Sequence, residues 1–127
     1  MDANALKMRT KIFALNVVCF CADLPRSVET SHVRSQLQRC ATSVAANYRA
    51  ACRGKSKADF VAKLGTVEEE ADESAFWLEF IRALNERRHL GLDYSSLQNL
   101  DRLRDEACQL LAITIASRKT ARGNAED

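Results

Sequence analysis

The sequence predicts an all-α protein folded as an antiparallel up-down-up-down four-helix bundle. Glycine and proline are scarce, with 4 and 1 among 127 residues, so few positions break a helix. Apolar residues recur in alternating steps of three and four along four separate segments, which is the spacing of one face of a helix. The connections between these segments are short, and short connections place successive helices antiparallel to one another.

The first segment has its apolar seam at Leu6, Thr10, Phe13, Val17, Phe20 and Leu24, and Pro25 ends it. Basic residues precede the apolar run "IFALNVVCFCADL", which superficially resembles a signal peptide. Asn16 interrupts the run and no clean small-residue cleavage site flanks it, so we expect a helix of the bundle and no signal peptide. No apolar run in the sequence reaches the ~20 residues of a membrane span.

The second and third segments follow the same spacing. The second has its seam at Val33, Leu37, Cys40, Val44, Asn47 and Ala51 and ends near Gly54, a residue type that suits the position after a helix. Ser56, with Asp59 three residues later, predicts the N-cap of the third segment. The third seam is Phe60, Leu64, Val67, Ala71, Ser74, Leu78 and Ile81, and the segment runs to about His89, with Gly91 after it.

Asp93 or Ser95 is expected to cap the fourth segment. Its seam is Leu100, Leu103, Ala107, Leu110 and Thr114, flanked by Leu97, Leu111 and Ile113. We therefore expect a single four-helix-bundle domain over residues 1–117. Residues 118–127 lack a periodic apolar face, so we expect a frayed or disordered C-terminal tail whose removal costs little stability.

Charge is divided unevenly along the chain. Residues 1–63 contain 11 Lys or Arg against 4 Asp or Glu, whereas residues 64–117 contain 5 against 11. Such a division suits head-to-tail pairing of subunits and nucleic-acid binding equally. The five cysteines show no Cys-x-x-Cys pair and no zinc-type spacing, which favours reduced thiols and a cytoplasmic location.

The stretch "SQLQRCATSVAANYRAACRGKSKADFVAKL" resembles the central signature of the bacterial four-helix-bundle family encoded in intervening sequences of large-subunit ribosomal RNA genes. The matching positions are Gln36, Leu37, Arg39, Ser43, Val44, Asn47, Arg53, Ser56, Phe60, Leu64 and Glu73. Ala50 and Ala51 occupy places where much of the family has Glu and Gly. The resemblance implies a helical bundle and a ring of five subunits, without a known reaction. A similar pentamer that accompanies the reverse transcriptase of diversity-generating retroelements contacts nucleic acid, which suggests a binding role by analogy.

A polar stripe crosses the second segment. Arg39, Ser43 and Asn47 lie at i, i+4 and i+8, and Arg53 lies about one and a half turns beyond them. Alanines surround the stripe and would let another helix approach closely. We favour a seam in which Ser43 and Asn47 hydrogen-bond across a tight helix contact, with a binding stripe as the alternative.

An acidic and aromatic stretch marks the third segment. Glu69 and Glu73 share one stripe of "EEEADE", and Arg39 and Arg49 are candidate partners for this acidic patch within the chain. The patch is either a solvated face or a surface that pairs with a neighbouring subunit. The candidate assembly residues are Glu69, Glu73, Phe76, Trp77 and Phe80.

The sequence does not favour a catalytic or metal-binding site. Glu29-x-x-His32 and Glu86-x-x-His89 match the two Glu-x-x-His pairs of a di-iron bundle site, which also needs two further carboxylates. Both pairs lie near helix ends, however, and the second lies off the seam. No matched carboxylate pair, phosphate-binding loop or Ser/His/Asp set is evident. We expect no catalytic residue, no metal and no cofactor.

The sequence thus predicts a non-enzymatic cytoplasmic bundle that assembles with itself, with a ring of five as the expected state, and acts as a binding or scaffolding module. The alternative is a protein that binds RNA or DNA through basic residues of the second helix. The candidate contacts are Arg34, Arg49, Lys55 and Lys57, joined by Arg39, Arg53 and the basic residues of the tail, Arg118, Lys119 and Arg122.

Overall fold

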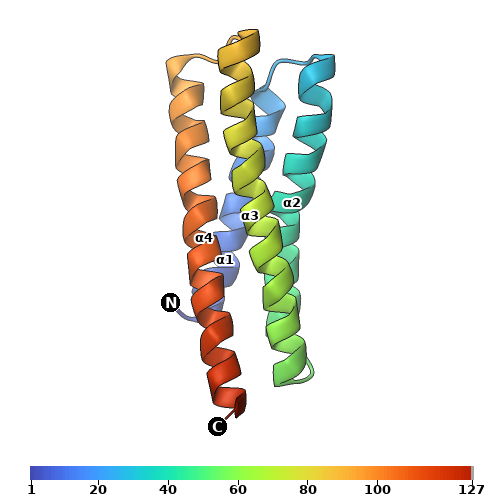
Figure 1. The fold of residues 1–127 in the computed structure, drawn as a ribbon, viewed down its shortest axis with the longest axis vertical. Helices are drawn as coiled ribbons and strands as arrows, with labels where there is room; N and C mark the ends of the chain where they lie inside the picture. Colours follow the sequence, from blue (N-terminus) through green and yellow to red (C-terminus); the bar gives the residue numbers. More distant parts are fainter. Residues whose placement is uncertain (127) are drawn as a thin grey trace.

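The computed structural model describes the backbone of residues 1–126 and the side chains of residues 1–123. The chain forms α1 (Ala3–Asp23), α2 (Val28–Cys52), α3 (Lys57–Arg88) and α4 (Tyr94–Glu126), which run alternately up and down in Figure 1. No strand occurs among residues 1–126. The predicted all-α four-helix bundle is therefore confirmed.

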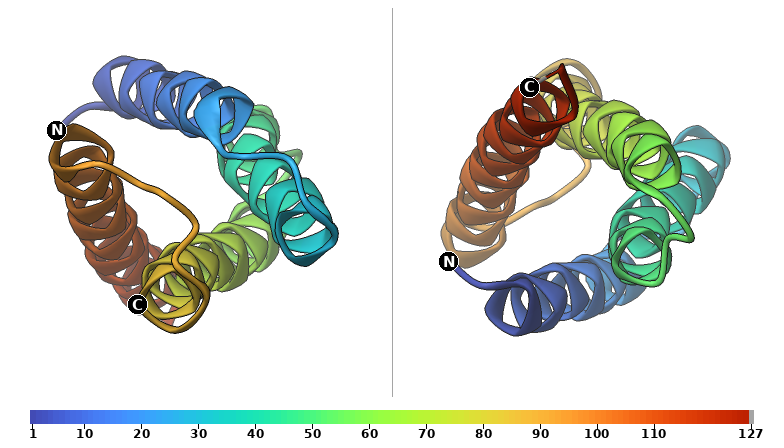
Figure 2. Two further views of the ribbon diagram at one scale, coloured as in Figure 1. Left: turned by 90° about the horizontal axis from the view of Figure 1, so that it is seen from above. Right: turned by 90° about the horizontal axis from the view of Figure 1, so that it is seen from below.

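The four helices are neighbours in chain order around the bundle. Each packs against the next, and α1 also packs against α4, as the views along the long axis show (Figure 2). Arg9 of α1 fastens this last contact, because its guanidinium donates to the carboxylate of Glu106 at 2.8 and 2.6 Å and to Gln109 at 2.7 Å. No helix within the described part of the chain is long and apolar enough to cross a membrane.

The core follows the predicted seams. Buried side chains include Phe13 and Val17 of α1, Leu37 of α2, Leu64 of α3 and Leu110 of α4, together with every other seam residue except Asn47 and Phe60. Asn47 is only partly buried. Tyr48, with 5% of its surface exposed, occupies the core position that was expected for Asn47. The larger apolar area of a tyrosine explains this one-residue change of register.

Local signals define the helix ends. Ser56 caps α3 by accepting from the Asp59 amide at 3.1 Å, and Asp93 caps α4 by accepting from the Ser96 amide at 2.8 Å. At the far end of α3 the left-handed residue is His89, with φ 50°, and Gly91 also has a positive φ of 84°. Both N-cap predictions are confirmed, with Asp93 chosen over Ser95.

The end of α4 differs from expectation. We expected residues 118–127 to fray, but the backbone of α4 continues as a helix to Glu126, and Asp127 lies outside the described backbone. Arg118 donates to Glu68 of α3 at 2.7 Å, and Ala121 is buried with 9% of its surface exposed. The end of α4 is held against the bundle by a polar pair and a small buried residue. A pattern of large apolar residues therefore does not predict it.

Candidate functional site

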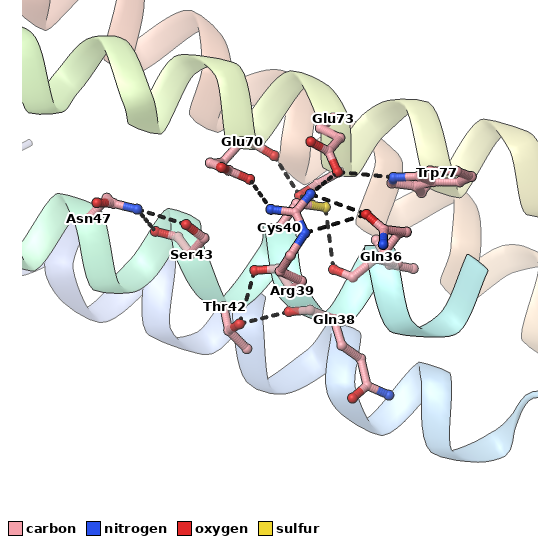
Figure 3. Close-up of polar contacts among 12 residues, drawn as sticks. Gln36, Gln38, Arg39, Cys40, Thr42, Ser43, Asn47, Glu70, Glu73 and Trp77 are labelled. Carbon is pink, nitrogen blue, oxygen red and sulfur yellow. Dashed lines mark hydrogen bonds and ion pairs between the residues drawn. The ribbon is translucent and has the colours of Figure 1, made fainter. Parts of the chain in front are cut away.

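Arg39 lies at the centre of a polar network between α2 and α3 (Figure 3). Its guanidinium forms an ion pair with Glu73 and lies 3.3 Å from Glu70, and it also donates to Gln36 at 3.4 Å. The indole nitrogen of Trp77 donates to the same Glu73 carboxylate at 3.2 Å. The hydrogen bond to Glu73 raises the pKa of Arg39 above its ordinary value. These groups satisfy one another within one chain.

Ser43 and Asn47 do not bridge two helices. The Asn47 amide donates to the Ser43 side-chain oxygen at 2.7 Å and to the Ser43 carbonyl oxygen at 3.0 Å, so both bonds stay within α2. Our expectation that these two side chains hydrogen-bond across a helix contact is wrong. The i, i+4 spacing already brings each within reach of the other on one helix, which satisfies them locally. Arg53 is separate from this pair and forms the C-cap of α2.

A buried thiol lies under the network. Cys40 has no exposed surface, and the Ser74 hydroxyl lies 3.3 Å from its sulfur and 2.8 Å from the Glu70 carbonyl oxygen. Burial raises the pKa of the Cys40 thiol to about 11. A thiol with so high a pKa is almost entirely protonated at neutral pH, and the thiolate is the nucleophilic form.

The basic residues expected to contact nucleic acid divide into two groups. Arg34 is used within the fold, because its guanidinium donates to the carbonyl oxygens of Cys21, Leu24 and Pro25 at 3.0 to 3.1 Å, at and just after the end of α1. Lys119 and Arg122 of α4 are exposed. So are four residues at the end of α2 and just beyond it, Arg49, Arg53, Lys55 and Lys57. Within the described residues, none of these four side chains has a recorded hydrogen bond or ion pair. Arg34 therefore has a structural role at the end of α1, and the exposed basic residues are the stronger candidate contacts.

A groove of about 730 Å³ runs between the outer faces of α1 and α2; we refer to it as the α1–α2 groove. Its walls include exposed apolar side chains of α1, and α2 contributes Ala45 and Ala46. Its basic residues are Lys7, Lys11, Arg49 and Arg53. The α1 wall was not among the residues predicted from the sequence. The signal was present, because the run "IFALNVVCFCADL" is apolar on more than one face of a helix, which one buried seam does not explain.

The outer face of α3 carries a second exposed surface. Phe76 and Phe80 have 51% and 41% of their surface exposed, and Glu69 and Asp72 are exposed on the same face. Trp77 is partly buried against the core, with its ring 4.9 Å from that of Phe76 and 5.7 Å from that of His32. Of the five candidate assembly residues, Glu69, Phe76 and Phe80 face outward, whereas Glu73 and Trp77 belong to the Arg39 network.

Three further carboxylates bind partners within the chain. Glu29 accepts from Arg88 at 3.1 Å, and hydrogen bonds from its own backbone amide and from Ser27 are the main cause that holds its pKa below the ordinary value. Glu68 binds Arg118, and Asp59 binds Lys63 at 2.7 Å. Among the described residues, no three His, Cys, Asp or Glu side chains gather in a way that could hold a metal ion.

Comparisons with known proteins add two findings. A family model described as "23S rRNA-intervening sequence protein" matches residues 4–114. The chain is also similar to a crystal structure of a protein of unknown function from the S23 ribosomal protein family of Bacteroides thetaiotaomicron. That likeness has a TM-score of 0.77 and 25% identity, and it covers 94% of this chain and 99% of the other. Comparison with curated proteins gave no match.

Proposed function

The chain belongs to the family of 23S rRNA-intervening sequence proteins, and on that premise we propose that it is a non-enzymatic homo-oligomer that acts as a binding or scaffolding module in the cytoplasm. The matched residues 4–114 include the core of all four helices, so the premise applies to the whole bundle. The fold supplies no reaction by itself, and the function has to be argued from the surfaces.

The observation that carries the proposal is the exposure of large apolar side chains on two separate helices. Met8 and Leu15 of α1 have 58% and 55% of their surface exposed, and Phe76 of α3 has 51%. Large apolar side chains that are exposed beside charged residues are typical of a surface that another protein covers. A second copy of the chain is the partner that is always present.

The non-enzymatic part of the proposal is supported by how the polar groups are used. Arg39, Glu70 and Glu73 bind one another, and the pKa of the Cys40 thiol is raised to about 11 by burial. The cytoplasmic location is supported by the cysteines, because all five are free thiols.

Five subunits are the expected number, because the family resemblance implies a ring of five. In a heterologous ring every subunit presents two different surfaces, and each contact joins one surface to the other. The basic and acidic halves of the sequence suit such a contact. Exposed ion pairs contribute only ~0–1 kcal/mol each, so apolar contacts would provide most of the affinity and charges would set the orientation.

Light scattering coupled to size exclusion tests the proposal. We expect a particle with about five times the 14.2 kDa mass of one chain and a helical circular-dichroism spectrum. Binding of an RNA hairpin and a DNA duplex is measured on the same sample at several salt concentrations, because phosphate contacts weaken steeply as salt rises. A monomer that binds nucleic acid in this salt-dependent way would replace our proposal with the nucleic-acid alternative.

A further inference from the structure

We propose that the α1–α2 groove of one copy receives the outer ridge of α3 from a second copy. The α3 ridge consists of Glu69, Asp72, Phe76 and Phe80. The inference rests on the proposed function, since it names the two surfaces through which the chain would assemble with itself.

The α1–α2 groove combines an apolar wall with a basic end. Met8, Leu15 and Val18 line it from α1 with 58%, 55% and 37% of their surface exposed. On the α2 side, Ala45 and Ala46 lack bulk, so an entering side chain would lie close to the α2 backbone. A volume of about 730 Å³ has room for aromatic side chains.

The basic end of the groove is formed by Lys7 and Lys11 of α1 and by Arg49 and Arg53 of α2. None of these four side chains has an ion pair recorded within the described part of the chain. An occupant that suits both ends of the groove must therefore present an apolar part and an acidic part together.

The α3 ridge presents these two parts. Its four residues are spaced by three, four and four positions, which places them on one face of the helix. All four are exposed, and no hydrogen bond or ion pair of the Glu69 or Asp72 side chain is recorded among residues 1–123. Glu70 and Glu73 differ, because they turn toward α2 and bind Arg39.

Charged and apolar groups follow one another in the same order along the α1–α2 groove and along the α3 ridge. In the groove, Arg53 and Lys7 lie toward the end of the bundle with the α2–α3 connection, and Val18 lies toward the opposite end. The ridge has the same order, because α3 starts at that connection and reaches Glu69 before Phe80. Two copies with parallel bundles would therefore bring acid to base and aromatic to apolar groups in one contact.

The two surfaces do not compete within a chain. The groove opens between α1 and α2, whereas the ridge lies on the outer face of α3, which is diagonally opposite α1 in the bundle (Figure 2). Each copy can therefore receive one neighbour and enter another, which is a heterologous contact. A polynucleotide would satisfy the basic end alone and would leave the apolar wall in water.

Charge reversal tests the contact. The ridge variant is Glu69→Lys with Asp72→Lys, and the groove variant is Lys7→Glu with Lys11→Glu. We expect each variant to raise the dissociation constant of the assembly by about tenfold or more, since attraction becomes repulsion at the rim. The chain carrying all four changes should regain mass, because its charges are complementary again.

Matched controls separate this effect from general ones. Asp23→Lys with Glu86→Lys changes the net charge as much as the ridge variant does, at exposed positions outside both surfaces, and should keep the wild-type mass. Phe76→Ser with Phe80→Ser should lower the mass, while Val28→Ser with Tyr94→Ser, at residues 90% and 76% exposed, should not. Circular dichroism confirms that each variant is folded.

The outcomes distinguish the two proposals. If the wild-type chain is a monomer at the highest concentration reached, the assembly proposal and this inference both fail. If the wild type assembles but the ridge and groove variants keep its mass, assembly stands and the groove-to-ridge contact is overturned. Loss of RNA or DNA binding in the groove variant at unchanged mass would identify nucleic acid as the occupant and would also overturn the inference.

Discussion

Arg39 shows how one residue type can serve a structural role or a binding role. Its side chain is 48% exposed, yet the carboxylates of Glu70 and Glu73 are only 18% and 35% exposed and depend on it for their charge partner. Arg49 is also basic, exposed and on the same helix, but no partner of its side chain is recorded among the described residues. The two arginines should therefore respond differently to removal.

We predict that Arg39→Ala lowers the free energy of unfolding by about 1 kcal/mol, because two partly buried carboxylates lose a charge-assisted partner. Urea denaturation measures the change. The emission of Trp77 should also shift, because its indole shares the Glu73 carboxylate with Arg39.

Arg49→Ala is the matched control and should change the free energy of unfolding by no more than about 0.5 kcal/mol. Equal losses in the two variants would mean that Arg39 contributes nothing specific to the network.

The residue scale also shows where the sequence is informative. Arg39 and Arg49 were the candidate partners of the acidic patch on the third helix. Arg39 binds Glu70 and Glu73 of that patch, whereas no ion pair of Arg49 is recorded among the described residues. Asn47 was expected in the seam, but Tyr48 is buried there, because a spacing rule cannot choose between adjacent residues when one is polar and the other is large and amphipathic. The bond between Asn47 and Ser43 depends on side-chain rotamers, which a spacing rule does not specify.

At the scale of an element, two glycines of similar appearance in the sequence have opposite roles. A Cβ at Gly65, in the middle of α3, would lie 3.6 Å from Cζ of Arg118, which is an ordinary contact. A Cβ at Gly54, after α2, would lie 3.0 Å from the Ala51 carbonyl oxygen and 3.0 Å from the Asp59 carboxylate, which is tighter than ordinary contacts and requires these atoms to shift. Gly54 does not have a positive φ, so close approach is the reason for a glycine there.

We predict that Gly65→Ala raises the free energy of unfolding by about 0.5–1 kcal/mol, because alanine loses less backbone entropy in a helix than glycine does. Gly54→Ala should lower it by about 1–3 kcal/mol, because the backbone oxygen cannot move away cheaply. Urea midpoints of the two variants provide the measurement. A loss of stability in Gly65→Ala would show that α3 and α4 are closer at this position than the structure describes.

Helix ends could be predicted from the sequence because they depend on local chemistry. Ser56 and Asp93 hold the amides three residues later, and the pKa of Asp93 is lowered mainly by its hydrogen bond from the Ser96 backbone amide. The outer face of α1 could not be predicted in the same way. Apolar side chains such as Met8 and Leu15 are consistent with burial in a core until the neighbouring helices are placed, and only then is their exposure visible.

At the scale of the whole molecule, the four seams were enough to predict the bundle, whereas the end of α4 was not predictable from them. The ion pair of Arg118 and Glu68 joins residues 50 positions apart, and neither residue marks an apolar face. A polar pair between two helices depends on how the helices are placed relative to each other along the bundle axis. The residue pattern of a single helix does not contain this information.

The end of α4 leads to the last prediction. Truncation after Ser117 removes Arg118, which is the partner of Glu68. It also removes the buried Ala121, so the surface that Ala121 covers becomes exposed. Glu68 and Arg118 have only 18% and 26% of their side-chain surface exposed, so the carboxylate left behind is poorly solvated. We predict that truncation lowers the free energy of unfolding by about 1–3 kcal/mol, the cost of leaving a buried polar group without its partner.

Arg118→Ala in the full chain should reproduce most of this loss, and Arg118→Ala with Glu68→Ala should cost less than the two single changes added together, since the pair is coupled. Urea denaturation of the wild type, the truncated chain, the two single variants and the double variant measures both effects. An unchanged midpoint after truncation would mean that α4 contributes nothing beyond Ser117, which is what the sequence alone had led us to expect.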